Sequence, residues 1–312
     1  MYRFFLLIFL IATAAAGLKK VFADPQKTEK VFEIIAGKAI MKISAHGGRI
    51  ISFRLRDKEL ITNKNEHEIF GSTLWTAPQS DWGWPPFETL DQVEYNVEKH
   101  RDTLKMISKP EIKSGFQFEK TFIAIDNRFI RIEYRIRNIS EKEKAVAAWE
   151  VTRVPSGGLA FFPTGEIGKV PESTLKCNLP QHGINWVAIN KTPTAENQKL
   201  FATASEGWLG YTFKDVLFIK QFPDTKPDNY SPNQAEVEIY VNAKKSYAEL
   251  ENHGPYTLLQ PGKSISYTVN WFLVPVPKKI DSKCPNQQLS TYLRKKINKS
   301  KADLNLKSRI KF

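Results

Sequence analysis

Residues 129–138 read Phe-Ile-Arg-Ile-Glu-Tyr-Arg-Ile-Arg-Asn, and this stretch decides the fold class. Its apolar side chains occupy every second position and alternate with arginine and glutamate, which is the period of a β-strand with one buried and one solvated face. An alternating run of phenylalanines precedes it, and Asp126 and Asn127 lie between the two runs as turn residues. The two runs predict an antiparallel hairpin.

Similar short alternating runs recur along most of the chain, with turn-forming residues between them. They lie at residues 32–43, 50–55, 145–154, 200–205, 208–213, 216–222, 235–241, 246–251 and 264–274. Many short strands without interleaved helices are typical of a sandwich or barrel. The sequence therefore predicts an all-β fold built of antiparallel strands.

The C-terminal end is the one helical candidate. Leu289, Tyr292, Leu293, Lys296 and Ile297 follow helical spacing, so we expect a helix that packs either on the sandwich or on a membrane surface. Most of the apolar alternation ends at Val276, so we expect a folded core without residues 285–312. The prediction divides the chain into residues 1–23, one β-domain over 24–284, and a basic, partly helical tail over 285–312.

The N-terminal segment has the layout of a secretory signal peptide. Arg3 precedes an apolar run over residues 4–16, and small residues allow cleavage after Ala16 or after Ala23. A spanning helix needs about 20 apolar residues, so the run is short for a membrane anchor. We expect export to the periplasm or beyond.

The formal net charge of +13 is unevenly distributed. The first 23 residues hold three basic groups and no acidic one, and residues 285–312 hold eight Lys/Arg against Asp303 alone, which leaves the body near +3. Such a body gives no reason to expect nucleic acid as a partner. The tail is either solvated or in contact with an anionic envelope surface. A monomer is expected.

Cysteine and histidine usage suggests no cofactor. Cys177 and Cys284 are the only cysteines, and whether they pair is left open. The five histidines form no recognised metal-ligand spacing, although His46 and His253 could face a pocket. The sequence thus predicts neither a metal nor a cofactor.

Tryptophan is concentrated in one segment, where Trp75, Trp82 and Trp84 fall within ten positions. Gly83 and several prolines in residues 75–86 argue against regular structure, so a loop is expected. These rings either cover an open end of the sandwich or stack on the apolar face of a sugar ring. Binding residues concentrate on loops of rigid scaffolds, which favours the second interpretation.

Two carboxylates share a predicted strand near residue 250. If residues 247–251 form a strand, Glu249 and Glu251 project from one face while Ala248 and Leu250 point to the core. Adjacent carboxylates can divide acid and base roles when their pKa values differ. Ordinary surface charge is the alternative.

Several short motifs together resemble the galactose-mutarotase-like superfamily. They are Gly-Gly-Arg-Ile-Ile-Ser at 47–52, the Glu-Leu-Glu strand at 249–251, a Leu-x-Pro-Gly turn at 259–262 and Ser-Tyr-Thr-Val-Asn-Trp at 266–271. Within it, the chain is most similar to a bacterial family of unknown function with a comparable Trp-Gly-Trp-Pro-Pro segment. The resemblance spans roughly residues 31–277 and implies a large antiparallel β-supersandwich that binds sugar on a concave sheet face.

The resemblance also implies a catalytic arrangement, which this chain matches only in part. In mutarotases a glutamate deprotonates the anomeric hydroxyl and a histidine protonates the ring oxygen. Glu251 matches that base best and Glu249 second. The histidine is expected near Trp149, where none is present, and Arg153 is too basic to replace it as an acid.

We therefore expect an exported carbohydrate-recognising protein. The predicted substrate-binding residues are Arg49, Trp75, Trp82, Trp84 and Arg153, with Glu249 and Glu251 as candidate catalytic residues. The arginines leave room for an acidic sugar, because guanidinium clamps carboxylate in bidentate fashion. One alternative is a mutarotase-type aldose epimerase or another glycan-processing enzyme. A second is a non-catalytic envelope interaction protein.

Overall fold

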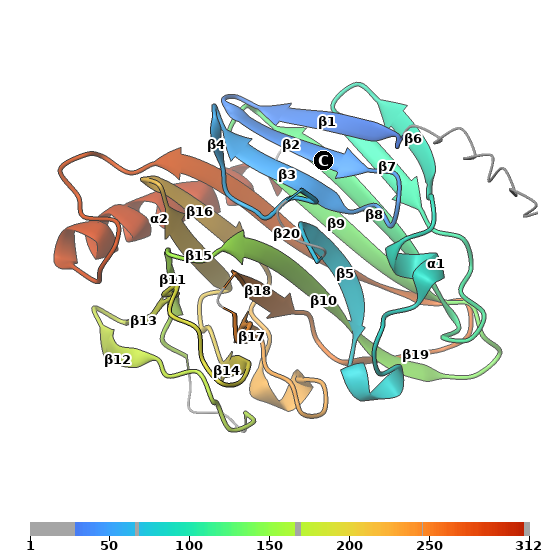
Figure 1. Cartoon of the computed structure of the whole chain (residues 1–312). Coiled ribbons are helices and arrows are strands. Elements are labelled where there is room, and N and C mark those ends of the chain that lie inside the picture. The colour runs from blue at the N-terminus through green and yellow to red at the C-terminus, as the bar shows by residue number, and fades with distance from the viewer. Residues whose placement is uncertain (1–28, 66–68, 166–169, 245, 309–312) are drawn as a thin grey trace, which may run out of the picture.

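The computed structural model describes residues 29–65, 69–165, 170–244 and 246–308 (Figure 1). The expected signal peptide, residues 1–23, lies outside the described residues. In the described part the strands form two sheets. The first sheet comprises β1 (Val31–Ala36), β2 (Ala39–Ser44), β3 (Ile50–Leu55), β4 (Lys58–Glu59), β5 (Ser72–Ala77), β10 (Lys144–Pro155), β14 (Gln198–Ala202), β17 (Val237–Val241), β18 (Tyr247–His253) and β19 (Thr257–Leu259).

The second sheet comprises β6 (Asn96–His100), β7 (Thr103–Ile107), β8 (Phe116–Ile125), β9 (Phe129–Asn138), β11 (Leu159–Pro163), β12 (Asn178–Gln181), β13 (Ile184–Ala188), β15 (Trp208–Phe213), β16 (Val216–Gln221) and β20 (Ser264–Pro275). The helical elements are η1 (Gln79–Asp81), α1 (Glu88–Asp91), η2 (Pro227–Asn229) and α2 (Gln287–Ser308). The strand order is β1-β2-β3-β5-β10-β18-β17-β14 in the first sheet and β12-β13-β11-β15-β16-β20-β9-β8-β7-β6 in the second. The all-β prediction is confirmed.

The main core lies between the two sheets. Phe53 of β3 meets Phe218 of β16 and Trp271 of β20, with ring centroids 5.4 and 5.2 Å apart. The predicted hairpin is β8 and β9, and its alternating apolar residues are the buried ones. Burying each such side chain stabilises the fold by about 1.5–3 kcal/mol.

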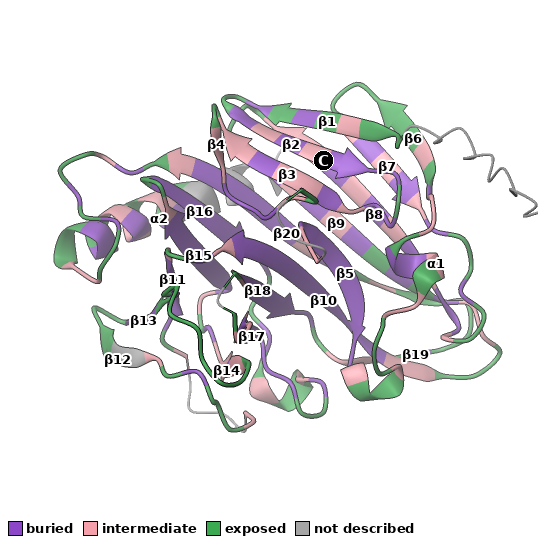
Figure 2. Ribbon diagram, viewed as in Figure 1, coloured by how far each residue is buried: buried purple, intermediate pink, exposed green. Residues whose placement is uncertain are grey.

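Two strands near the centre of the first sheet are covered on both faces. Residues 146–154 of β10 and 248–253 of β18 are buried without interruption, whereas β8 and β9 alternate (Figure 2). A strand with one wet face would alternate, so the outer face of the first sheet, which points away from the second sheet, is also covered at this place. The candidate site lies on this face.

The structure differs from the sequence prediction at two segments. Residues 32–43, expected as one run, form β1 and β2 with a turn at Gly37, whose positive φ of 64° favours glycine. The expected loop at residues 75–86 begins later, because Trp75 to Ala77 complete strand β5 beside β10. Pairing with a buried neighbouring strand supplies backbone hydrogen bonds that the local sequence does not reveal.

The C-terminal helix α2 is part of the folded core, contrary to the expectation that residues 285–312 are dispensable. Leu289, Leu293 and Ile297 are fully buried against the outer face of the second sheet, in a cluster that includes Trp186 and Trp208. The Asn286 side chain accepts a hydrogen bond from the Leu289 amide at 2.8 Å and caps the helix start. The helical spacing of these apolar residues therefore marks the face by which α2 packs on the second sheet.

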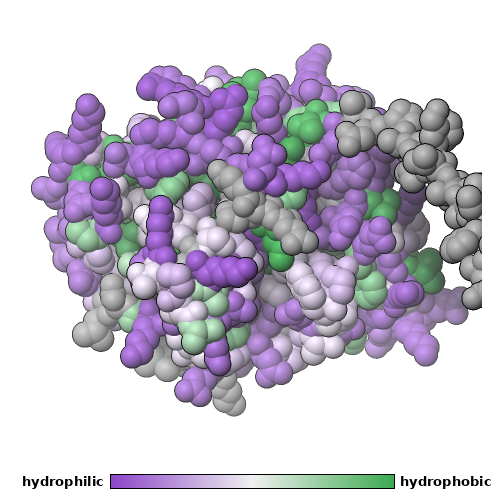
Figure 3. Space-filling model, in the orientation of Figure 1, coloured by the Kyte–Doolittle hydropathy of each residue, from purple (hydrophilic) through white to green (hydrophobic). Residues whose placement is uncertain are grey.

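The two cysteines are unpaired, and the face of the molecule seen in Figure 3 is largely hydrophilic. Cys177 is half-buried and Cys284 exposed, and both are free thiols. No helix among the described residues is long and apolar enough to cross a membrane. Hydrophilic residues dominate the face shown in Figure 3, and hydrophobic residues are scattered among them.

Candidate functional site

Three neighbouring strands place the predicted residues on the outer face of the first sheet. Antiparallel pairing sets Trp75 of β5 opposite Trp149 of β10, and Arg153 of β10 opposite Glu249 of β18. Side chains at every second position share a face, so these residues lie on one surface. The predicted strand at Glu249 and Glu251 is confirmed, with Ala248 and Leu250 in the core.

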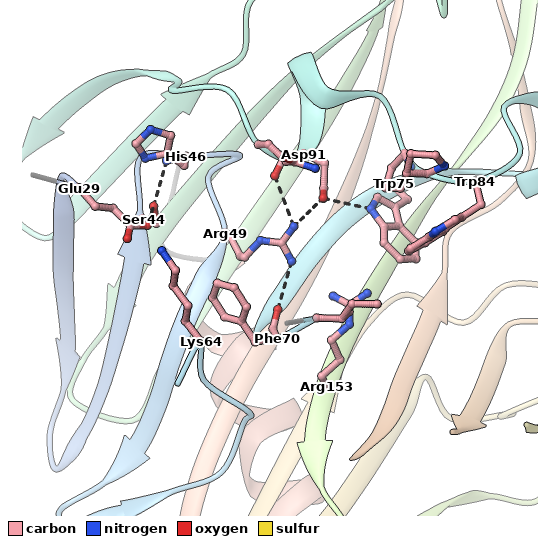
Figure 4. A pocket seen from close by; sticks show the side chains of 14 residues that line it. Glu29, Ser44, His46, Arg49, Lys64, Phe70, Trp75, Trp84, Asp91 and Arg153 are labelled. Atoms are coloured by element: carbon pink, nitrogen blue, oxygen red, sulfur yellow. Dashed lines mark hydrogen bonds and ion pairs between the residues drawn. The ribbon is translucent and has the colours of Figure 1, made fainter. Parts of the chain in front are cut away.

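A cavity of about 570 Å³ opens on this face (Figure 4). It is lined by Glu29, Ser44, His46, Arg49, Lys64, Ile69, Phe70, Trp75, Trp84, Pro85, Pro86, Asp91, Gln92 and Arg153. Four of the five predicted substrate-binding residues, Arg49, Trp75, Trp84 and Arg153, thus line one cavity. A volume of this size is typical of small-molecule sites.

The two loop tryptophans have different environments. Trp84 is 60% exposed and stands edge-on to Trp75, with centroids 5.8 Å apart and an interplanar angle of 81°. Trp82 lies outside the cavity; its Nε1 donates to the Thr76 carbonyl at 2.9 Å and its ring packs on Trp75 and Trp149. Trp84 is therefore free to contact a ligand, whereas Trp82 covers the strand surface.

Asp91, which the sequence did not mark, organises the upper wall of the cavity. Its carboxylate accepts from Arg49 Nη2 at 2.6 Å, from Thr73 Oγ1 at 2.8 Å and from Trp75 Nε1 at 3.1 Å. Burial opposes its ionisation, but Arg49 and Thr73 outweigh burial and hold the pKa of Asp91 below its ordinary value. Asp91 therefore fixes Arg49 and the Trp75 indole in place.

Arg153 forms the floor of the cavity. Its Nε donates to Glu249 Oε1 at 2.8 Å, and its guanidinium carbon lies 5.1 Å from the Trp75 ring centroid. The side chain is only 1% exposed, and Nη1 has no hydrogen-bond partner among the residues that the structure describes. Burial raises the pKa of Glu249, and Arg153 opposes that shift. A buried donor on a cavity wall can bind a ligand oxygen.

Glu251 lies deeper, outside the cavity wall, in a buried polar cluster that we call the Glu–His cluster: Lys199, Glu238, Glu251 and His253. Lys199 Nζ lies 2.5 Å from Glu238 Oε2 and 3.1 Å from Glu251 Oε2. Trp149 Nε1 also donates to Glu251 Oε2, at 2.8 Å. Burial raises the pKa of Glu238 to about 8. Sequence spacing could not find this cluster, because it joins three strands.

A histidine does lie beside Trp149, although it comes from another strand than the one expected. His253 is the cross-strand partner of Trp149, and the two rings stack with centroids 5.2 Å apart. Burial lowers the pKa of His253 well below its ordinary value, so the ring is neutral. One ligand atom each from Glu238, Glu251 and His253 lie within 4.8 Å of one another.

The family model for a domain of unknown function, DUF4380, matches residues 52–274, which is more than half of the chain. The chain belongs to this family. No curated protein matches the DUF4380 chain. Its fold is the galactose-mutarotase-like supersandwich that the sequence motifs predicted.

Solved structures share this fold at low sequence identity. A galactose mutarotase related enzyme from Lactobacillus acidophilus is 11% identical with a TM-score of 0.56, over 81% of this chain and 100% of that one. A GalM/aldose epimerase homologue from C. elegans is 10% identical with a TM-score of 0.53, over 80% and 100%. The Slr1438 protein from Synechocystis sp. PCC 6803 is 13% identical with a TM-score of 0.56, over 79% and 96%. These similarities show the fold of the DUF4380 chain.

Proposed function

We propose that the protein binds a carbohydrate in the cavity between Trp84 and Arg153. The observation that carries the proposal is that the exposed Trp84 ring and the buried, donor-bearing Arg153 line the same cavity. An indole offers a flat apolar surface to a pyranose, and guanidinium donors bind its oxygens. The superfamily includes proteins described as mutarotase-related and aldose epimerase homologues, which supports a sugar as ligand.

Within this proposal an acidic sugar is the favoured ligand. Arg153 Nη1 is an unused donor, and Lys64 brings a further positive charge to the lining of the same cavity. Export from the cytoplasm belongs to the same proposal, because residues 1–23 resemble a signal peptide and glycans are abundant outside the cell. A uronate-containing oligosaccharide is thus the first ligand to test.

The test compares Trp84→Ala with Trp82→Ala in calorimetric titrations against neutral and uronate-containing oligosaccharides. Loss of stacking at Trp84 should weaken binding by about 1–3 kcal/mol, the range for stacking on aromatic side chains, with little change in melting temperature. Trp82→Ala should lower the melting temperature, because this ring packs on Trp75 and Trp149. Equal affinity of wild type and Trp84→Ala for every sugar that binds would refute the proposed site.

A mutarotase-type aldose epimerase is the second candidate, favoured by the position of His253 two residues from Glu251 on the same strand. A glutamate base and a histidine acid are the groups that anomer exchange requires. Both side chains are buried outside the cavity wall, which is why sugar binding is the primary proposal. If the protein is an epimerase, anomer exchange measured by NMR should be lost in Glu251→Gln. No exchange in the wild type, for any sugar bound, would eliminate it.

A further inference from the structure

The Glu–His cluster contains a group of metal-ligand atoms on a rigid part of the sheet. Glu238 of β17 and Glu251 of β18 are direct cross-strand partners, and His253 follows two residues later on the same face. We propose that Glu238, Glu251 and His253 bind a divalent first-row transition metal ion, Zn²⁺ in the first place, and that the Lys199 ammonium competes with it. This proposal is independent of sugar binding, because none of these residues lines the cavity.

The donor set suits such an ion. Two carboxylates and one neutral imidazole are ligands of zinc and related metals, whereas the imidazole disfavours calcium and magnesium. Three protein ligands also leave a coordination position open, as in catalytic sites. The carboxylates are oriented by outer contacts: the Ala235 amide donates to Glu238 Oε1 at 2.9 Å, and Trp149 Nε1 donates to Glu251 Oε2.

Unused polar atoms point to a ligand at this place. Glu251 Oε1 and both ring nitrogens of His253 are buried and have no hydrogen-bond partner among the described residues. His253 Nε2 lies 3.4 Å from Glu238 Oε1, too far for a strong hydrogen bond. Buried polar groups without partners destabilise a fold, so a metal ion that used them would recover stability.

The charge balance also favours a divalent ion over the lysine alone. Lys199 is the one ammonium shared by Glu238 and Glu251, since Glu249 is engaged by Arg153, and a dication bound to both carboxylates in their deprotonated form would neutralise the pair fully. The Lys199 side chain is 26% exposed, while both glutamates are fully buried. Lys199 can therefore swing outward and open a path from solvent to the ligands.

The experiment uses Co²⁺ as a spectroscopic probe and Zn²⁺ in competition, with the full chain freed of metal by chelation. We expect one ion per chain, with visible absorption bands of cobalt in a low-symmetry site that Zn²⁺ abolishes. Lys199→Met should tighten Co²⁺ binding about tenfold or more, because repulsion between the ammonium and the dication disappears. Glu251→Gln and His253→Asn should each weaken Co²⁺ binding by roughly 100-fold. The loss of a direct ligand should cost at least as much affinity as the loss of a side chain that only hydrogen-bonds to a ligand.

His100→Asn is the matched control, because His100 is exposed on β6 and lies outside the cluster. Its Co²⁺ affinity should equal that of the wild type.

Since His253→Asn removes a buried ring and can impair folding, anomalous diffraction from zinc-soaked wild-type crystals gives a second measurement. An anomalous peak between Glu238, Glu251 and His253 supports the proposal. No 1:1 binding by Lys199→Met, or a peak elsewhere only, overturns it and leaves the lysine as the permanent counter-ion.

Metal binding and acid catalysis by His253 make opposite demands on the ring. The ring nitrogen that coordinates a metal cannot also carry the proton that an acid donates, so anomer exchange that uses this nitrogen of His253 should disappear when Zn²⁺ is bound. Exchange that is unaffected by zinc, in a protein that binds one zinc ion at the cluster, would exclude His253 as the acid without touching the metal proposal.

Discussion

Arg153 links the cavity to the deeper carboxylates at the scale of single residues. It is fully buried, stacks on Trp75, pairs with Glu249, and still has one unused donor at Nη1. Isolated buried charge is costly, so each member of the pair depends on the other. An arginine is also the side chain best suited to hold an oxygen-rich ligand while remaining charged.

Removing either member of the Arg153–Glu249 pair should therefore destabilise the protein more than removing both. Arg153→Met alone should lower the free energy of unfolding by about 3–5 kcal/mol, because Glu249 is left without its counter-charge. The double variant with Glu249→Gln should recover most of that loss in urea unfolding. Lys42→Met, which breaks the exposed pair with Glu33, should change stability by less than about 1 kcal/mol. Additive losses at Arg153 and Glu249 would show that the pair is uncoupled.

Lys120 makes stability depend on pH. Its buried Nζ donates to the Gly47 carbonyl at 2.6 Å, and burial, opposed by Asp91, lowers the pKa of Lys120 to about 7. The unfolded chain holds this proton up to a pKa of about 10.4, so the folded state binds fewer protons between these values. This cost is fully present below pH 7 and disappears as pH rises toward 10.

The difference between wild type and Lys120→Met isolates this effect, because other groups titrate equally in both. From pH 7 to pH 10 the wild type should gain stability relative to the variant, by an amount on the order of 4 kcal/mol. Chemical denaturation at several pH values measures the gain. A pH-independent difference would mean that Lys120 titrates at its ordinary pKa in the folded protein.

Helix α2 shows at the scale of elements how a basic segment can be structural. Over residues 287–299 its basic side chains are exposed or half-buried, while one apolar stripe closes the outer face of the second sheet over Trp186 and Trp208. Without the helix these large aromatic rings would be exposed to water. Packing of this kind, more than helix propensity, holds a helix in place.

Leu293→Ser should accordingly destabilise the whole fold. The change removes a fully buried side chain, so we expect a loss of about 2–5 kcal/mol in the free energy of unfolding and increased binding of a hydrophobic dye. Lys295→Ser, on the exposed side of the same helix, is the matched control and should have little effect. Equal stabilities would show that α2 is only loosely attached.

Two packed sheets hold the whole molecule together without covalent links. Polar pairs are buried even between the sheets, where Lys220 Nζ lies 2.8 Å from Glu150 and Tyr134 donates to the same carboxylate at 2.7 Å. Such groups are tolerated because they satisfy one another. Stability comes from the extensive apolar core and not from a disulfide.

Thiol chemistry tests the disulfide-free arrangement. Titration of the denatured chain with a thiol reagent should count two free cysteines, and addition of reductant should leave the melting temperature unchanged. In the native protein Cys284, which is exposed, should react before the half-buried Cys177. A drop in melting temperature on reduction would reveal a bridge.

Local sequence determined the fold class and many of the strands. Alternation with period two is a property of neighbouring residues, so β8, β9 and β18 could be predicted, including the shared face of Glu249 and Glu251. The aromatic segment at residues 75–86 could also be recognised from its composition, because it holds three tryptophans. Short ordered motifs then carried the superfamily resemblance.

Only the tertiary structure decided what these residues do together. Strand register set His253 against Trp149 and joined Lys199 and Glu238 to Glu251, across sequence separations that no local pattern encodes. The same packing left Trp84 exposed and Trp82 partly buried, although both flank Gly83 in the same loop. The sites of this protein are products of pairing between distant strands, whereas its strands are products of local alternation.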